Sequence, residues 1–249
     1  MILTAAVILS AVSCKFFSVS GPLGDKTIQY GESAVGGSDK SASREYEIGE
    51  FTSLDISVPC SVEYSTGTPW VKVSAPENIL EALEVVCEDG ELSLRLEKRI
   101  RVRKDISIKV SSSALSSLTI NGAAEFDAAS LNVPQDFSVV ANGAADIEVK
   151  DLKAADVNVV GNGASDIEFD RLCCDDLSII INGAGDIDFD ALECANVVVR
   201  VDGAGDVSLR GEAKTADLSI HGAGVIDVRN LSAGDLKSNV SGLGKVRHK

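Results

Sequence analysis

Five acidic side chains recur at one position of a regular pattern in the C-terminal half of the sequence. Each stands three residues after a glycine; they are Glu125, Asp146, Asp166, Asp186 and Asp206. Carboxylate oxygens are ligands that Ca²⁺ prefers, and stacked carboxylates repel one another unless they are bonded or neutralised. A calcium-binding ladder is therefore one interpretation. The interpretation that we favour is structural: each acid caps its own corner by accepting hydrogen bonds from backbone N–H groups.

A basic segment, residues 98–104, carries arginine at alternate positions: Arg99, Arg101 and Arg103. In a strand this alternation would place the three arginines on one face and the intervening aliphatic residues on the other. Such a face could contact an anionic glycan or a lipid headgroup. A solvated strand face, or pairing with the chain's own acids, explains the same residues, and we favour that explanation.

Few residues could form a catalytic site. The sequence has two histidines, His221 and His248, and it lacks the short motifs of zinc proteases, serine hydrolases and phosphate-binding loops. Polysaccharide lyases and glycoside hydrolases need basic groups or paired carboxylates in a groove. The acids here follow a repeat, and Trp70 is the only tryptophan available to stack on a sugar. The sequence therefore favours a non-enzymatic protein without cofactor or metal, with a carbohydrate-active enzyme as the alternative.

The sequence has six cysteines, and two of them share a place in the pattern. Cys174 and Cys194 each stand 11 residues after a glycine, so stacked repeats would make them neighbours. They could form a disulfide or remain stacked thiols. Cys60 and Cys87 could bridge in an oxidising compartment.

A repeat of about 20 residues positions these side chains. Its glycines are Gly122, Gly143, Gly163, Gly183, Gly203 and Gly222, each followed by alanine, and Gly242, followed by leucine. Asn precedes the first four, and Asn and Gly both tolerate a left-handed backbone, so each site predicts a tight corner. We expect the alanines to point into a crowded interior. We also expect the corner asparagines to hydrogen-bond from one repeat to the next.

Alternating apolar residues flank each corner and predict strands with one buried face, as at 186–189 and 197–201. Asn-Gly between alternating strands is also a hairpin signal, which allows an antiparallel meander. A solenoid instead stacks each residue on its equivalent about 20 positions later, roughly 4.8 Å away, and so makes columns of identical residues. Because several columns here are homotypic, we predict an all-β parallel solenoid over residues 121–249.

Residues 46–120 break the period but retain strand-like alternation, at 51–58, 92–96 and 106–110 among others. Asp89-Gly90 predicts a hairpin turn, and a helical pattern follows Asn78, which we expect to be its N-cap. An open solenoid end is an unpaired strand edge that must be covered. We therefore assign residues 46–120 to irregular first rungs or a capping module. Exposed ends also favour self-association into a homo-oligomer.

The N-terminal segment predicts export. Residues 2–13 are apolar or small, and their length suits a signal peptide and is too short to span a bilayer. The ending Ala-Val-Ser-Cys at Cys14 resembles a bacterial lipobox, in which the cysteine is lipidated. We expect residues 1–13 to be a signal peptide and residues 14–45, rich in Ser and Gly, to be a flexible tether from a lipid anchor at Cys14. A buried N-terminal strand or helix is the alternative.

The composition limits the kinds of partner that the protein can bind. The formal net charge is −15, and an acidic surface repels phosphate backbones, so we expect no nucleic-acid partner. Aromatic residues make up 4% of the chain, so aliphatic side chains must fill the core. Aliphatic side chains can fill the narrow interior of thin stacked layers.

The order and spacing of these segments resemble one known family. The sequences FTSLDI at 51–56 and GELSL at 90–94, followed by repeated INGA and GAGDI, are similar to the head GIN domain family, described as auto-transporter adhesins of the Bacteroidetes. The resemblance covers about residues 46–246. It implies a right-handed parallel β-helix and an exported protein, and it carries over no catalytic residue. We therefore expect an adhesin-like or structural lipoprotein of the cell envelope that binds glycans or envelope or host components. We expect it at the outer membrane or the cell surface, and it could also face the periplasm. The alternative is a polysaccharide lyase or hydrolase on the same fold.

Overall fold

The computed structural model describes residues 35–38, 40–97, 100–101 and 106–249, which belong to one compact unit, residues 33–249. The predicted signal peptide, Cys14 and most of the predicted tether lie outside the described residues. Strand β2 (Ser41–Tyr46) shows that ordered strands begin within the range that the sequence assigns to the tether. The helix of the described part, α1 (Glu77–Ala82), is too short to cross a membrane, and no other described helix could do so.

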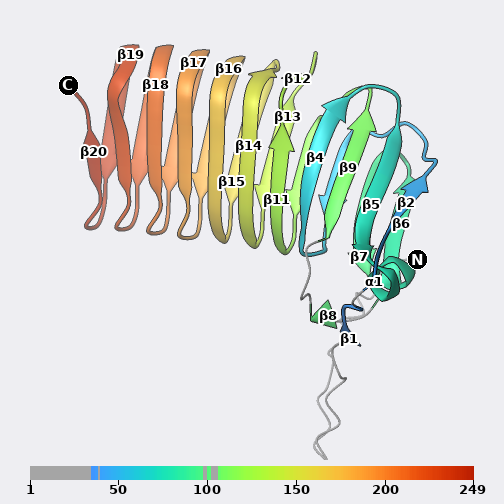
Figure 1. Cartoon of the computed structure of the whole chain (residues 1–249). Helices are drawn as coiled ribbons and strands as arrows, with labels where there is room; N and C mark the ends of the chain where they lie inside the picture. The colour runs from blue at the N-terminus through green and yellow to red at the C-terminus, as the bar shows by residue number, and fades with distance from the viewer. Residues whose placement is uncertain (1–34, 39, 98–99, 102–105) are drawn as a thin grey trace, which may run out of the picture. The chain divides into compact units, whose positions relative to one another are not determined.

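Parallel rungs, stacked side by side, form the regular part of the fold (Figure 1). Their strands are β10 (Ser117–Ile120), β11 (Ala123–Ala128), β12 (Leu131–Asn132), β13 (Phe137–Ala141), β14 (Ala144–Lys153), β15 (Asp156–Gly161), β16 (Ala164–Ile181), β17 (Asp186–Val201), β18 (Asp206–Ile220), β19 (Val225–Val240) and β20 (Lys245–Arg247). Ile147 lies opposite Ile167, and Ile167 lies opposite Ile187, so the offset between these rungs is 20 residues. The pairings that these strands make with one another are all parallel, which confirms the predicted solenoid and excludes the meander.

Each rung has two arms that meet at the glycine corner. One arm precedes the corner, as β13 and β15 do, and the other follows it, as β11 and β14 do. The inward residues of both arms are aliphatic or aromatic, and they stack on their equivalents in the next rung. The rings of Phe169 and Phe189, for example, are parallel to within 6° with centroids 4.8 Å apart. The core is therefore a set of thin layers, as the low aromatic content suggested.

Close contact between rungs, and not turn conformation, explains the corner glycines. A Cβ atom at Gly163 would lie 2.0 Å from the carbonyl oxygen of Gly143, and the same clash recurs at the later corners. At Gly122, where the glycine column begins, a Cβ atom would meet nothing within 4 Å. The predicted left-handed backbone is wrong for the corner glycines from Gly122 to Gly222, none of which has a positive φ. It is confirmed at the last corner, where Gly242 has a φ of 126°.

The corner asparagines form the predicted ladder. The side-chain amide of Asn182 donates to Asn162 at 2.7 Å, Asn162 donates to Asn142 at 2.8 Å, and Asn142 donates to Asn121 at 2.9 Å. The ladder ends where Asn121 donates to the carboxylate of Asp55 at 2.9 Å. Each amide therefore satisfies the next, and the column links four rungs to the N-terminal module.

The alanines that follow the corner glycines point outward, so their predicted interior position is wrong. Ala144 and Ala164 are exposed, whereas the next residues, Ala145 and Ser165, are buried. The reason is the parity of the strand: counting back by twos from buried Ile147 makes Ala145 the inward residue.

Two more rungs precede the regular ones, and the chain forms them out of spatial order. Strands β3 (Ser53–Ile56) and β4 (Cys60–Thr66) pair in parallel with β10 and β11. Strands β7 (Glu91–Leu96) and β9 (Ser107–Ser112) pair in parallel with the other edges of β3 and β4. The chain therefore lays down an inner rung, adds an outer one, and then returns past the inner rung to start the regular stack.

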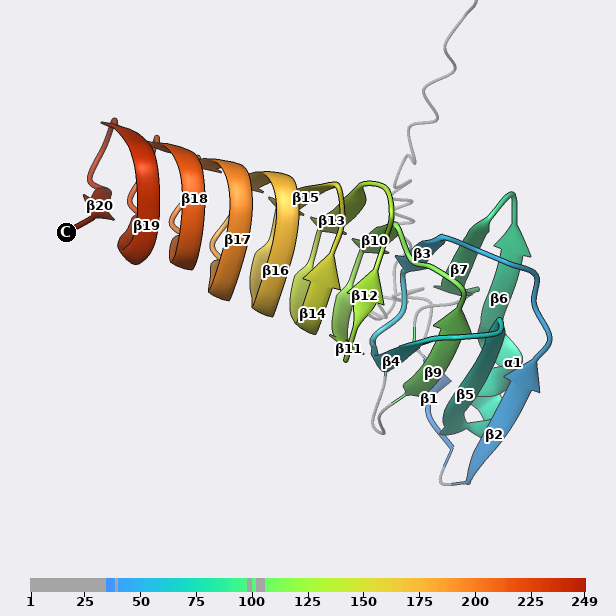
Figure 2. The ribbon, with the colours of Figure 1, turned by 90° about the horizontal axis from the view of Figure 1, so that it is seen from above.

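Antiparallel strands and α1 cover this end of the stack. Strand β5 (Trp70–Pro76) pairs with β9, β2 pairs with β5, and β6 (Leu83–Glu88) pairs with β7, all antiparallel, while α1 lies beside β5 and β2 (Figure 2). Asp89 and Gly90, both with positive φ, form the predicted hairpin turn between β6 and β7. The predicted N-cap is wrong: α1 begins at Glu77, and the Asn78 side chain instead accepts a hydrogen bond from the Ser38 N–H at 2.8 Å.

Candidate functional site: an acidic groove

An open groove of about 700 Å³ runs across several rungs, along the arm that follows the glycine corner. Two parallel rows line it: the outward alanines Ala123, Ala144, Ala164, Ala184 and Ala204, and the acids Glu125, Asp146, Asp166 and Asp186. Each acid stands two residues after an alanine, and both rows are exposed on the outward face. Small inward residues such as Ser165 and Gly185 lie between the rows. Because the side chains along one row are only methyl groups, a ligand could approach the backbone closely there.

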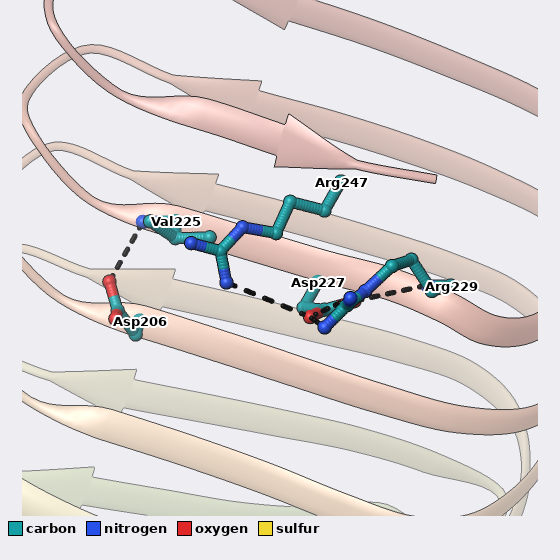
Figure 3. A network of polar contacts seen from close by, with 5 residues as sticks. All are labelled: Asp206, Val225, Asp227, Arg229 and Arg247. Atoms are coloured by element: carbon teal, nitrogen blue, oxygen red, sulfur yellow. Dashed lines mark hydrogen bonds and ion pairs between the residues drawn. The ribbon is translucent and has the colours of Figure 1, made fainter. Parts of the chain in front are cut away.

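The strand register stacks the acids one rung apart, with Asp166 between Asp146 and Asp186. These three side chains make no hydrogen bond or ion pair with a described residue. At one end of the row, Glu125 accepts a hydrogen bond from the hydroxyl of Ser61 at 2.7 Å. At the other end, Asp206 accepts one from the N–H of Val225, in the next rung, at 2.8 Å (Figure 3). The prediction that each acid caps its own corner is therefore wrong.

Asp166, the central acid of the row, has a raised pKa. Desolvation by partial burial, and then the charges of Asp146 and Asp186, raise the pKa of Asp166 above its ordinary value. An unpaired stack of like charges opposes folding at neutral pH. Sites that retain such a conflict are candidates for function, because a ligand can supply the missing partners.

A second group of acids lies on the same outward face, further from the corner. Oxygen atoms of Glu168, Asp170 and Asp190 lie within 4.8 Å of one another, a spacing that a cation could bridge. Partial burial, and then Asp190 and Asp170, raise the pKa of Glu168. Arg210 of the next rung already forms an ion pair with Asp190. Among the described residues, Asp190 is therefore already paired with a cationic side chain, unlike Glu168 and Asp170.

The acidic character of this face ends at the last rungs, where arginines neutralise the carboxylates. Arg229 binds Asp227 at 2.5 Å, and Arg247 approaches the same carboxylate at 3.9 Å (Figure 3). The hydrogen bond from Arg229 is the main cause that lowers the pKa of Asp227. Asp227 therefore has cationic partners, whereas Asp166 in the groove has only carboxylates as its neighbours in the adjacent rungs.

Carboxylate spacing does not single out a catalytic pair. Neighbouring rungs repeat about every 4.8 Å, close to the separation of about 5–5.5 Å found in retaining glycosidases. Every adjacent pair in the row therefore has a similar separation. The raised pKa values of Asp166 and Glu168 come from partial burial and like-charged neighbours that the repeat supplies. The raised pKa of Asp166 therefore does not by itself identify a catalytic acid.

Of the arginines of the basic segment and the single tryptophan, the structure describes Trp70 and the backbone of Arg101. Arg99 and Arg103 are outside the described residues, as is the side chain of Arg101, whose backbone in β8 (Ile100–Arg101) pairs with β1 (Val35–Gly36). Trp70 lies on β5, in the capping module and outside the groove. Sequence reasoning found the acids but missed the groove, because it placed the alanines inside. The strand parity set by Ile147 was the signal that could have shown them to be outward.

Cys174 and Cys194 are opposite each other in adjacent rungs, as the sequence predicts. Cys60 lies opposite Ala124 and Cys87 lies opposite Leu92, and all five described cysteines are free thiols in the structure. The Cys60–Cys87 bridge that the sequence allowed is therefore not formed.

The stacked rungs and the outward groove define a parallel β-solenoid with an acidic surface site. A family model described as "Putative auto-transporter adhesin, head GIN domain" matches residues 50–170 and 160–248. The chain therefore belongs to the head GIN domain family.

Solved structures share the fold at low sequence identity. A "putative adhesin" from Bacteroides fragilis is 20% identical with a TM-score of 0.78, and the match covers 87% of this chain and 100% of that one. A "putative adhesin" from Parabacteroides distasonis is 16% identical, with a TM-score of 0.70 and coverage of 87% and 100%. A "putative lipid binding protein" from the same species is 18% identical, with a TM-score of 0.67 and coverage of 87% and 99%. No curated protein matches the chain.

Proposed function

We propose that this protein is an adhesin-like, non-enzymatic module of the cell envelope and that it binds glycans in the acidic groove. The family and the solved structures support the adhesin-like role. The observation that carries the choice of ligand is the row Asp146, Asp166 and Asp186, three exposed carboxylates without partners beside a row of methyl groups.

The chemistry of the groove limits the glycan class. Carboxylates accept hydrogen bonds from sugar hydroxyls and form ion pairs with amino groups, and both are stronger than neutral hydrogen bonds. The same charges repel sulfated sugars and uronic acids. The ligand is therefore a neutral glycan or one that contains free amino sugars, and its repeated hydroxyls can meet successive rungs.

A glycan array probed at several salt concentrations tests the proposal. We expect the wild-type chain to bind neutral or amino glycans and the double variant Asp166→Asn, Asp186→Asn to lose about tenfold or more in affinity, because each lost charged hydrogen bond is worth about 1.5–3 kcal/mol. The matched control is Asp175→Asn, Asp217→Asn, which removes the same charge from exposed positions outside the groove.

Three other outcomes decide between the alternatives. Equal loss in the control would indicate a general charge effect and contradict a site in the groove. Absence of binding to every glycan would overturn the glycan proposal and leave an envelope or host protein as the ligand class. Release of shorter saccharides from a bound glycan would favour the carbohydrate-active enzyme.

We also propose that the protein is exported and anchored to a membrane by a lipid on Cys14. The support is the apolar run that leads into a lipobox-like sequence, together with membership of an adhesin-like family. Fatty-acid labelling in cells tests it: Cys14→Ser should abolish the label and release the protein from the membrane fraction, whereas Cys87→Ser should change neither. Labelling that persists in Cys14→Ser would disprove the anchor.

A further inference from the structure

Two inward cysteines in adjacent rungs lie in direct register. Cys174 of β16 is opposite Cys194 of β17, each side chain is 8% exposed, and the two sulfur atoms lie 2.6 Å apart. Directly opposed residues of parallel strands have Cα atoms about 4.8 Å apart, within the range of about 4.4–6.8 Å that disulfides span. The pair therefore meets the distance requirement without movement of the backbone.

No other described cysteines are opposed in this way. Cys173 is the residue next to Cys174, and its exposed side chain points to the other face of the strand. Its neighbour in the next rung is Glu193. The column that contains the pair continues as Ala213, so a small apolar side chain also fits the site. Among the cysteines that the structure describes, this pair is the one that could join two neighbouring rungs covalently.

We propose that Cys174 and Cys194 form a disulfide when the chain folds in the presence of a thiol–disulfide oxidant. One cysteine thiolate attacks the oxidant's disulfide, which gives a mixed disulfide and expels one thiolate. The other cysteine thiolate then attacks the mixed disulfide at the protein sulfur, forms the Cys174–Cys194 bond and expels the second thiolate. The two protons pass through solvent to the expelled thiolates, and the two electrons of the cysteine pair reduce the oxidant.

The structure also indicates when the bond must form. In the folded reduced chain, the hydrogen bond to Cys194 and then burial raise the pKa of the Cys174 thiol. The nucleophile of disulfide exchange is the thiolate, which the raised pKa of Cys174 disfavours. Both cysteines are also buried, so neither sulfur is readily reached by an oxidant from solution. Oxidation is therefore fast while the two rungs are still open and slow once they have stacked. The redox state is set during folding and is then retained.

The bond would lock the centre of the groove. The rung that carries Cys174 also carries Asp166, and the rung that carries Cys194 also carries Asp186. A crosslink between them closes a loop of about 20 residues and restricts the unfolded chain, a constraint expected to raise stability. The like charges of Asp166 and Asp186 oppose the stacking of these two rungs, so the crosslink acts against that repulsion.

Refolding of the full chain tests the proposal. Denatured, reduced protein is refolded in a mixture of reduced and oxidised glutathione, and native, reduced protein is held in the same buffer. We expect the refolded sample to contain two fewer alkylatable thiols, with the peptides that carry Cys174 and Cys194 linked in mass spectrometry. Its melting temperature should exceed that of the reduced protein by about 5–10 °C. The native sample should oxidise far more slowly.

Two variants serve as controls. Cys174→Ala, Cys194→Ala should fold, because alanine occupies the next position of the column, and should lose the effect of oxidant on melting. Cys60→Ser, Cys87→Ser should retain it. The proposal is overturned if both thiols remain alkylatable after oxidative refolding, if a different cysteine pair is linked, or if the linked protein melts at the same temperature as the reduced one.

Discussion

At the scale of single residues, the stacked carboxylates of the groove lower the stability of the fold. Asp166 lies between two carboxylates and accepts no hydrogen bond from a described residue, and its raised pKa means that the folded chain holds this proton more tightly than the unfolded chain does. Stability therefore falls as pH rises through the raised pKa of the folded state, and at pH 7 the penalty is fully present.

Asp166→Asn should accordingly stabilise the chain at pH 7 by up to about 1 kcal/mol, or a rise in melting temperature of about 1–3 °C, because it removes like-charge repulsion between opposed residues. The gain should shrink as pH falls toward 3.8, the ordinary pKa, where wild-type Asp166 is itself protonated. Thermal melts at a series of pH values measure this. Asp175→Asn, an exposed site outside the row, is the control, and a pH-independent effect of Asp166→Asn would contradict the explanation.

The residue columns were predictable from sequence, but their roles were not. Identical offsets from the glycines placed the asparagines, acids and cysteines in register without any coordinates. Whether an acid has a hydrogen-bond partner depends on the group that lies opposite it in the neighbouring rung. Asp206 accepts a hydrogen bond from the N–H of Val225, whereas Asp166 lies opposite another carboxylate. The alanines that follow the glycines were predicted to face inward and face outward instead. The reason is that a glycine corner does not itself define which of the next two residues faces inward.

At the scale of the rung, each corner glycine from Gly143 onward lies against the backbone of the preceding rung. A side chain at Gly163 would meet the carbonyl of the previous rung at 2.0 Å, and no rotamer relieves a clash that begins at Cβ. The first glycine of the column lacks this neighbour, because a Cβ atom at Gly122 meets nothing within 4 Å. The fold therefore has room for a side chain at Gly122 but not at Gly163.

Gly163→Ala should destabilise the chain by about 3 kcal/mol or more, since overpacking against fixed backbone forces two rungs apart. Gly122→Ala, which has neither the clash nor a positive φ, should change stability by less than about 1 kcal/mol. Denaturant titrations of both variants give the comparison. Equal losses at the two sites would show that corner conformation, rather than contact between rungs, selects glycine.

The order of the first rungs could not be predicted from sequence. The strands at 92–96 and 106–110 were recognisable, but sequence order suggests that they lie between β4 and β10. They lie instead on the other side of β3 and β4, because β5, α1 and β6 intervene and carry the chain outward before it returns. A sequence period identifies neighbouring rungs only where the rungs repeat. The insertion of β5, α1 and β6 interrupts the period at the point where the chain changes direction, so the sequence does not show which strands are neighbours there.

At the scale of the whole described unit, the two ends of the stack differ. Three antiparallel pairings and a helix cover the end that contains β9. At the other end, β20 pairs with only three residues of β19, from Val225 to Asp227. Beyond that, β19 has a partner on one side, β18, and Val240 and Leu243 are 42% and 91% exposed. In a stack where each rung contacts only its neighbours, stability decreases toward an uncovered end.

Native-state hydrogen exchange should reveal that gradient. Amide protons of residues 230–240 that point to the free edge of β19 should exchange at rates set by local opening, whereas those of β17, which has a partner strand on both sides, should require opening of the stack. Peptide-level mass spectrometry at low protein concentration compares the two segments. Equal protection would contradict a free edge. Protection of 230–240 that disappears on dilution would instead show that a second copy pairs with this edge, the homo-oligomer that exposed solenoid ends favour.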